Sequence, residues 1–186
     1  MKKFIFPLLL SLFVLSCNKK GSSESSDNKG NTSKQSSSNH DGTEAKQALI
    51  EYSNEKATEL LQKKNDTLYV TNFFATWCKP CVVEIPHFKE KMDELKGKPV
   101  KFTYININVK EEWDTDVEQF VDEMGIRNQT ILLDPQKLND DFFNANFDSW
   151  VGEFIPYTML RKGDKVKELS GSVSKEELEK QIAAFQ

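Results

Sequence analysis

Apolar and polar positions repeat along the chain in patterns that predict helices alternating with strands. Helical spacing of apolar residues predicts an amphipathic helix over Glu44–Lys64, and an apolar run predicts a strand over 68–74. Helical spacing resumes from Pro80 to about Lys96, and Pro86 should kink that helix because it removes a backbone donor. The remaining predicted elements are strands over 101–109 and 130–133, a helix over 113–124 that ends at Gly125, a short Phe-rich helix over 138–147, a hairpin of strands 157–161 and 165–169 around Lys162-Gly163-Asp164, and a last helix from a capping box at Ser174 to Phe185. This order predicts an α/β domain with a central mixed β-sheet flanked by helices on both faces.

The first 43 residues follow a different pattern. Lys2 and Lys3 precede an apolar run that is too short to span a bilayer, which needs roughly 18 or more residues, and Ser16-Cys17 follows it. Residues 1–16 are therefore interpreted as a lipoprotein signal peptide with a bacterial lipobox, and Cys17 as the lipidated residue. The alternative is an ordinary secretory signal in which Cys17 has no role. Residues 17–43 are rich in Ser and Asn and almost free of apolar side chains, which predicts a disordered tether before a domain at 44–186.

Charge and composition narrow the possible partners. Without Lys2 and Lys3 the chain has 23 basic residues (25 minus 2) against 29 acidic residues, a net charge of −6, and no basic cluster. Nucleic-acid binding is therefore not expected. The sequence has no internal repeat, no phosphate-binding glycine loop and no His/Cys metal spacing, so we expect neither a metal ion nor an organic cofactor.

The candidate chemistry is in Trp77-Cys78-Lys79-Pro80-Cys81, between a predicted strand and a predicted helix. Of three cysteines, a lipidated Cys17 leaves only the pair Cys78 and Cys81. A single possible disulfide in an extracytoplasmic chain is more typical of redox chemistry than of scaffolding. The positive end of the helix would favour the thiolate of Cys78, which we expect to be exposed. The alternatives are a permanently closed disulfide and half of a zinc site, which would need two more ligands.

The segment from Asn72 to Pro86, NFFATWCKPCVVEIP, resembles the active-site segment of TlpA/ResA-type thioredoxin-like proteins, which are membrane-tethered thiol-disulfide oxidoreductases of the bacterial cell envelope. The resemblance covers most of residues 65–186, and Asp134-Pro135 and the segment 155–160 also fit it. It implies a thioredoxin fold. Two departures weaken any transfer of the substrate: the helix predicted over Glu44–Lys64 stands where the family has a β-hairpin, and Arg161 to Asp164 differ from the usual Ile-Asp before the turn.

The resemblance also implies roles for the residues around the dithiol. Cys78 would attack a substrate disulfide and Cys81 would resolve the mixed disulfide. Trp77 would pack beside Cys78 and exclude water, and Lys79 and Pro80 would tune the redox balance of the pair. Lys79 is alternatively only a surface charge. Other aromatic residues are expected in the core, namely Trp113, Trp150, Phe142, Phe143 and Phe147.

Two further positions complete the expected site. Thioredoxin has a buried Asp six residues before its first cysteine, where this chain has Asn72, which cannot titrate. The resemblance therefore assigns the proton relay to Glu84, three residues after Cys81 and on the same helical face; alternatively, Glu84 is a solvated helix charge. Pro156 is expected to be cis, with Ile155 presenting its backbone to an extended substrate strand. The alternative is an ordinary trans proline.

The leading functional hypothesis is a reductase of protein disulfides in the cell envelope. The resemblance first suggests apocytochrome c as the substrate and a membrane thiol carrier as the electron donor. The protein would be a lipid-anchored monomer outside the cytoplasm, facing the periplasm in a Gram-negative cell. A disulfide oxidase or isomerase is the main alternative, because potentials on this fold run from about −270 to −120 mV, although Pro80 favours a reductase. A redox-independent binding or chaperone module is a third possibility. Peroxide reduction is disfavoured because the Pro-x-x-x-Thr/Ser-x-x-Cys motif is absent.

Overall fold

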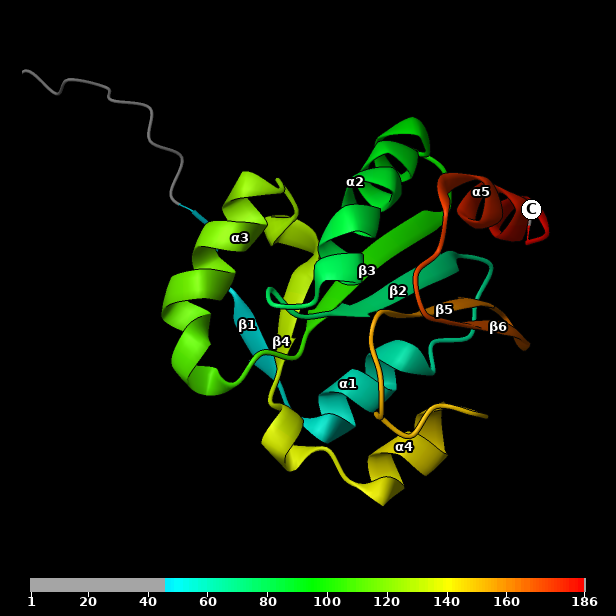
Figure 1. The fold of residues 1–186 in the computed structure, drawn as a ribbon. Helices are drawn as coiled ribbons and strands as arrows, with labels where there is room; N and C mark the ends of the chain where they lie inside the picture. The colour runs from blue at the N-terminus through cyan, green and yellow to red at the C-terminus, as the bar shows by residue number, and fades with distance from the viewer. Residues whose placement is uncertain (1–45, 186) are drawn as a thin grey trace, which may run out of the picture. The chain divides into compact units, whose positions relative to one another are not determined.

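A six-stranded mixed sheet in the order β1-β4-β3-β2-β5-β6 forms the centre of the computed structural model, which describes residues 46–185 (Figure 1). The strands are β1 (Ile50–Tyr52), β2 (Leu68–Phe74), β3 (Val100–Asn106), β4 (Thr130–Leu133), β5 (Tyr157–Lys162) and β6 (Lys165–Ser170). The first four strands pair in parallel, whereas β5 is antiparallel to both β2 and β6. The predicted mixed sheet is confirmed.

Helices cover both faces of this sheet. They are α1 (Asn54–Leu61), α2 (Lys79–Glu94), α3 (Glu118–Glu123), α4 (Asp140–Asn146) and α5 (Lys175–Ala183), with 3₁₀ turns at Lys110–Glu112, Arg127–Gln129 and Pro135–Lys137 and a π turn at Trp113–Val117. In Figure 1, α2, α3 and α5 lie over one face, and α1 and α4 lie over the other. The core is correspondingly divided into two apolar clusters, and the one under α2 contains both Cys78 and Cys81.

The predicted helix over Glu44–Lys64 is wrong in its first half. Residues 50–52 form the edge strand β1, which pairs in parallel with Ile131–Leu133 of β4, and α1 begins only at Asn54. The cause is local, because Ser53 has an extended backbone and its hydroxyl accepts a hydrogen bond from the Lys56 amide at 3.3 Å. This N-cap starts the helix and leaves the preceding backbone free to pair with β4.

The other predicted elements are present with small shifts at their ends. β2 and β4 have the predicted bounds, and α2 continues past Pro86. β3 stops at Asn106, because the Asn108 amide donates to the Asn106 side chain instead of extending the strand. The last helix is capped as predicted, with the Ser174 hydroxyl accepting from the Glu177 amide at 3.2 Å.

The aromatic residues predicted for the core are all buried. The indole of Trp150 stacks on Tyr157 with 4.4 Å between ring centroids and 9° between planes, and it also contacts Phe73. Its Nε1 donates to the carbonyl of Phe154 at 2.9 Å. This packing holds the segment just before Ile155-Pro156 against the sheet.

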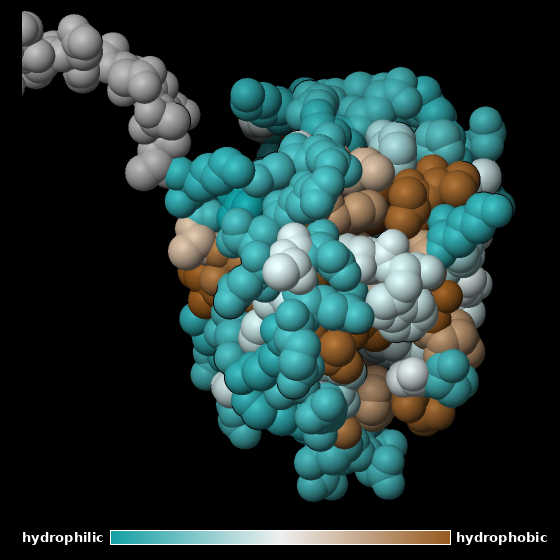
Figure 2. Space-filling view, turned by 60° about the vertical axis from the view of Figure 1, so that its left-hand side comes forward, coloured by the Kyte–Doolittle hydropathy of each residue, from teal (hydrophilic) through white to brown (hydrophobic). Residues whose placement is uncertain are grey.

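On the face shown in Figure 2, hydrophobic side chains form patches among hydrophilic ones. In the part of the chain that the structure describes, no helix has the length and apolar character to cross a membrane. The predicted signal peptide, Cys17 and the tether all fall within residues 1–43, outside the described residues, and stay predictions together with the domain boundary at 44.

Candidate active site

The two cysteines of the predicted motif form a disulfide at the start of α2, with 5.3 Å between their Cα atoms. Cys78 is the N-cap of the helix, and its Sγ accepts a hydrogen bond from the Cys81 amide at 3.3 Å. A thiolate at Cys78 would therefore lie against the unpaired amides and the positive end of α2, where negative charge is stabilised.

The disulfide is less accessible than expected. Cys78 is only 5% exposed and Cys81 is fully buried, so the prediction that Cys78 is exposed is wrong. The sulfur atoms are covered because both cysteines belong to the apolar cluster beneath α2. A substrate sulfur could approach Cys78 but not Cys81, which agrees with the assignment of Cys78 as the attacking thiol.

The residues expected to tune the dithiol lie on the surface. Trp77 is 65% exposed, so it does not exclude water in the way expected, and Lys79 and Pro80 are also exposed. The cause is their position, since side chains at the first turn of α2 that do not face the sheet point into solvent. Cys78 is buried as part of the apolar cluster under α2.

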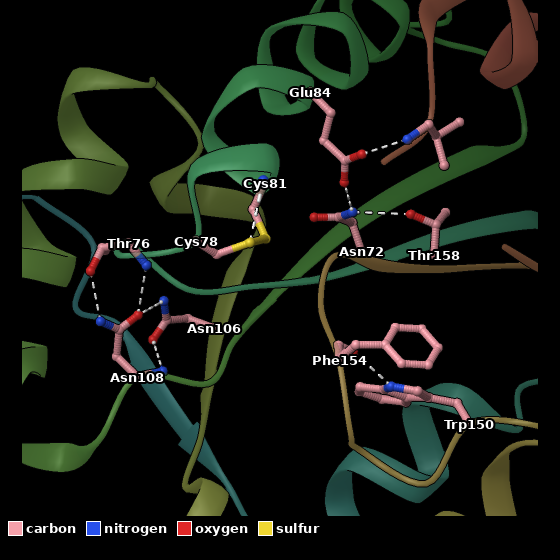
Figure 3. The surroundings of a disulfide bond; sticks show 11 residues. Asn72, Thr76, Cys78, Cys81, Glu84, Asn106, Asn108, Trp150, Phe154 and Thr158 are labelled. Carbon is pink, nitrogen blue, oxygen red and sulfur yellow. Dashed lines mark hydrogen bonds between the residues drawn. A yellow bond between two sulfur atoms is a disulfide. The ribbon is translucent and has the colours of Figure 1, made fainter. Parts of the chain in front are cut away.

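A buried amide network anchors the loop that carries Cys78 (Figure 3). Oδ1 of Asn108 accepts from the Thr76 amide at 2.9 Å and from Nδ2 of Asn106 at 2.7 Å. Nδ2 of Asn108 donates to Oγ1 of Thr76 at 2.7 Å and to Oε2 of Glu112 at 2.6 Å. The loops that follow β2 and β3 are thereby joined next to the disulfide. This network was not predicted, although two asparagines, Asn106 and Asn108, near the end of the strand predicted over 101–109 were a usable signal.

Glu84 is a buried acid, and the alternative of a solvated helix charge is wrong. The residue is 1% exposed, and its Oε1 accepts from Nδ2 of Asn72 at 2.7 Å while its Oε2 accepts from the Val173 amide at 2.7 Å. Burial raises the pKa of Glu84 from 4.5 to about 7, against the opposing effect of the hydrogen bonds from Val173 and Asn72. The carboxyl group can therefore both accept and release a proton near neutral pH.

Glu84 is hydrogen-bonded by groups from two other parts of the fold, and a third part supports one of these groups (Figure 3). Asn72 is on β2, and its Nδ2 also donates to Oγ1 of Thr158 at 3.0 Å, its neighbour in the β2–β5 register. Val173 precedes α5. From the sequence, Asn72 was predicted only to be a side chain that cannot titrate, and no role was predicted for Thr158 or Val173. A polar Asn inside an apolar strand was the one signal available.

The Ile155-Pro156 peptide bond is cis, as the resemblance implied. Ile155 packs against the apolar cluster that contains both cysteines, and the Pro156 carbonyl accepts from the Gly171 amide at 3.0 Å. The substrate-binding role of this segment stays a prediction. Within residues 46–185, no group of three or more His, Cys, Asp and Glu side chains is arranged to hold a metal ion.

Comparison with known proteins agrees with this site. The AhpC/TSA family model matches residues 42–165, more than half of the chain. The thiol-disulfide oxidoreductase ResA of Bacillus thuringiensis is 29% identical over 140 residues, which is 74% of each chain, and ResA of Bacillus subtilis is 26% identical over 136 residues, 72% of this chain and 69% of the relative. A thioredoxin-family thiol:disulfide interchange protein from Chlorobium tepidum superposes with a TM-score of 0.54 and 23% identity, over 68% of this chain and 83% of that chain, and shows that the fold is thioredoxin-like. The chain therefore belongs to the AhpC/TSA family, has a thioredoxin-like fold and is a thiol-disulfide oxidoreductase similar to the ResA proteins.

Proposed function

We propose that this protein reduces disulfides of other proteins outside the cytoplasm, with Cys78 and Cys81 as its dithiol and a lipid on Cys17 as its membrane anchor. The observation that carries the proposal is the buried carboxyl group of Glu84, placed one helical turn after the buried Cys81. A scaffolding disulfide has no need for such an acid, whereas a dithiol that must lose a buried proton does.

The reaction would proceed in two exchange steps. The Cys78 thiolate attacks one sulfur of the substrate disulfide, the substrate S–S bond breaks, and one substrate sulfur leaves as a thiolate. Cys81 then attacks Sγ of Cys78 and releases the second substrate sulfur. The substrate gains two electrons, and Cys78 and Cys81 return to the disulfide. A membrane thiol carrier would restore the dithiol by the same exchange in the opposite direction.

Glu84 would take the proton that Cys81 must lose before the second step. A group with a pKa of about 7 is suited to this role, because it is partly ionised at neutral pH and does not hold the proton too strongly. Replacing Glu84 by Gln should slow turnover and shift the titration of the cysteines. Glu90→Gln is the matched control, because Glu90 lies on the exposed face of the same helix and pairs with Lys175. Equal effects of the two substitutions on rate and titration would remove Glu84 from the mechanism.

The Ile155-Pro156 segment would bind an extended strand of the substrate through the Ile155 backbone. Apocytochrome c, whose Cys-x-x-Cys-His segment must be reduced before haem attachment, is the substrate we propose from the family resemblance. A Cys78→Ser/Cys81→Ser protein should have no activity in this role. Full function of that double variant would instead support a redox-independent binding or chaperone module.

The direction of electron flow is tested by the reduction potential of the Cys78–Cys81 couple. The full chain carrying Cys17→Ser would be equilibrated against defined thiol buffers, so that only the active-site pair exchanges. A potential near or below about −240 mV is expected for a reductase. A potential near about −120 mV would make the protein an oxidant and overturn the proposed direction.

A further inference from the structure

Asn72 carries an acceptor that the network around Glu84 leaves unused. The side chain is buried, and its Nδ2 donates to both Glu84 and Thr158. Its Oδ1 is also buried and has no hydrogen-bond partner among the described residues. Figure 3 shows this oxygen on the side of the amide that faces the disulfide, away from Glu84 and Thr158. A buried carbonyl without a donor costs free energy, so such groups are uncommon in folded proteins.

We infer that Oδ1 of Asn72 accepts a hydrogen bond from the Cys81 thiol when the protein is reduced. In the disulfide, the Cys81 sulfur has no proton to donate. Reduction breaks the S–S bond with two electrons and two protons, and the Cys81 side chain becomes free to rotate. Cys81 is fully buried, so its new S–H group has no access to bulk water and needs a protein acceptor. The unused oxygen of Asn72 is the acceptor on that side of the helix.

Glu84 determines which end of the amide faces the thiol. An ionised carboxylate only accepts hydrogen bonds, so Asn72 must turn Nδ2 toward Glu84 and Oδ1 toward the disulfide. The same orientation satisfies Thr158, whose hydroxyl can accept from Nδ2. Glu84 and Thr158 together fix the orientation of the Asn72 amide, with Nδ2 toward both of them. The acceptor Oδ1 is therefore the group of Asn72 that faces Cys81.

The hydrogen bond has two consequences for the dithiol, and both rest on the redox function proposed above. First, it exists only in the reduced protein, so it shifts the equilibrium toward the dithiol. Second, it stabilises the neutral thiol of Cys81 and raises the pKa of that thiol. Cys81 then stays protonated while Cys78 is the thiolate, which keeps the order of attack that the mixed-disulfide mechanism requires.

The S–H stretching band in the infrared spectrum tests the contact directly. In the full chain carrying Cys17→Ser and Cys78→Ser, Cys81 is the single thiol, and hydrogen bonding lowers its S–H frequency. We expect Asn72→Leu to move the band to higher frequency, because it removes the acceptor. Asn72→Asp combined with Glu84→Gln keeps an acceptor of the same shape on the side of Cys81 and a donor between the two side chains, so this double variant should keep the band low. Thr158→Val should leave the band in place.

A band that Asn72→Leu does not move would overturn the inference, as would a bridging water that alone accepts from Cys81. If Asn72→Leu does not fold, the Asn72→Asp/Glu84→Gln double variant decides the question, because a band at the frequency of a free thiol in that variant contradicts the contact. In the two-cysteine protein, Asn72→Leu should shift the equilibrium with glutathione toward the disulfide about tenfold, equivalent to about 30 mV. The infrared result needs no substrate, so it can fail independently of the proposed direction of electron flow.

Discussion

Ionisation of the buried Glu84 carboxyl should lower the free energy of unfolding as pH rises, and replacing Glu84 by Gln should remove this pH-dependent loss of stability. The folded-state pKa of Glu84 is raised from 4.5 to about 7, so the folded protein binds more protons than the unfolded chain between these values. Stability therefore falls as pH rises through this window, and the whole cost is present above pH 7. Each tenfold difference in proton affinity between the folded and unfolded states is worth about 1.4 kcal/mol. The rise of the pKa from 4.5 to about 7 therefore lowers the free energy of unfolding above pH 7 by about 3 kcal/mol. Burial at 1% exposure leaves little solvent screening to reduce it.

The assay is urea unfolding of the oxidised protein at pH 5 and pH 8.5, with wild type and Glu84→Gln side by side. Between these pH values, wild type should lose about 2–3 kcal/mol more stability than the variant. The Gln amide meets donors from both Asn72 and Val173, which adds a cost that does not depend on pH. The slope is therefore the test and not the absolute stability.

Glu90→Gln on the exposed face of α2 is the control and should parallel wild type. Other carboxylates contribute equally to all three proteins and cancel in the comparison. Parallel profiles for wild type and Glu84→Gln, within about 0.5 kcal/mol, would refute the reasoning, because the buried carboxyl would then have a similar pKa in the folded and unfolded states.

Four further substitutions test local features of the fold by urea unfolding of the oxidised protein. Gly152→Ala should cost about 2–4 kcal/mol, because Gly152 has a φ of +84° and an added Cβ would lie 2.4 Å from the ring of Phe143. Gly97→Ala, with a φ of +82° and open space, should cost only about 1–2 kcal/mol, and equal costs would contradict the clash. Asn108→Ala should cost about 2–4 kcal/mol because it leaves buried donors without acceptors, and a loss below about 1 kcal/mol would mean that water replaces the amide. Ser53→Ala should cost about 1 kcal/mol through loss of the α1 cap, and an unchanged midpoint would show that the cap is not needed.

The elements predicted best from the sequence are strands buried on both faces and elements bounded by clear turn residues. β2 and β4 consist mainly of apolar residues because both of their faces are covered, and such segments can be recognised without the fold. The β5–β6 hairpin is marked by Gly163-Asp164. β1 could not be predicted in this way, because it has three mostly exposed residues and exists only through its pairing with β4.

The same distinction applies to the site. Cys78, Cys81 and Glu84 are close in sequence on one helix, so motif spacing predicted their arrangement. Thr158 is 86 residues from Asn72, and Val173 is 89 residues from Glu84. Only the register of β2 with β5 and the return of the chain before α5 bring these groups together. The near-complete burial of Cys78 also depends on this packing, because the motif itself carries no information on what covers it.

The buried acid of this protein is on α2, whereas thioredoxin has its buried Asp on the strand before the first cysteine. This position determines how a movement of α2 would affect the acid. Cys81 and Glu84 are one turn apart on the same helix, so local helical geometry sets their separation. The groups that hydrogen-bond to Glu84 lie on β2 and before α5, so a shift of α2 on the sheet alters these hydrogen bonds but not the distance to Cys81. Those hydrogen bonds oppose the effect of burial on the pKa of Glu84, and losing either one would raise that pKa further. A small displacement of α2 between the oxidised and reduced states would therefore change how strongly Glu84 holds a proton, while Glu84 and Cys81 stay one turn apart on the helix.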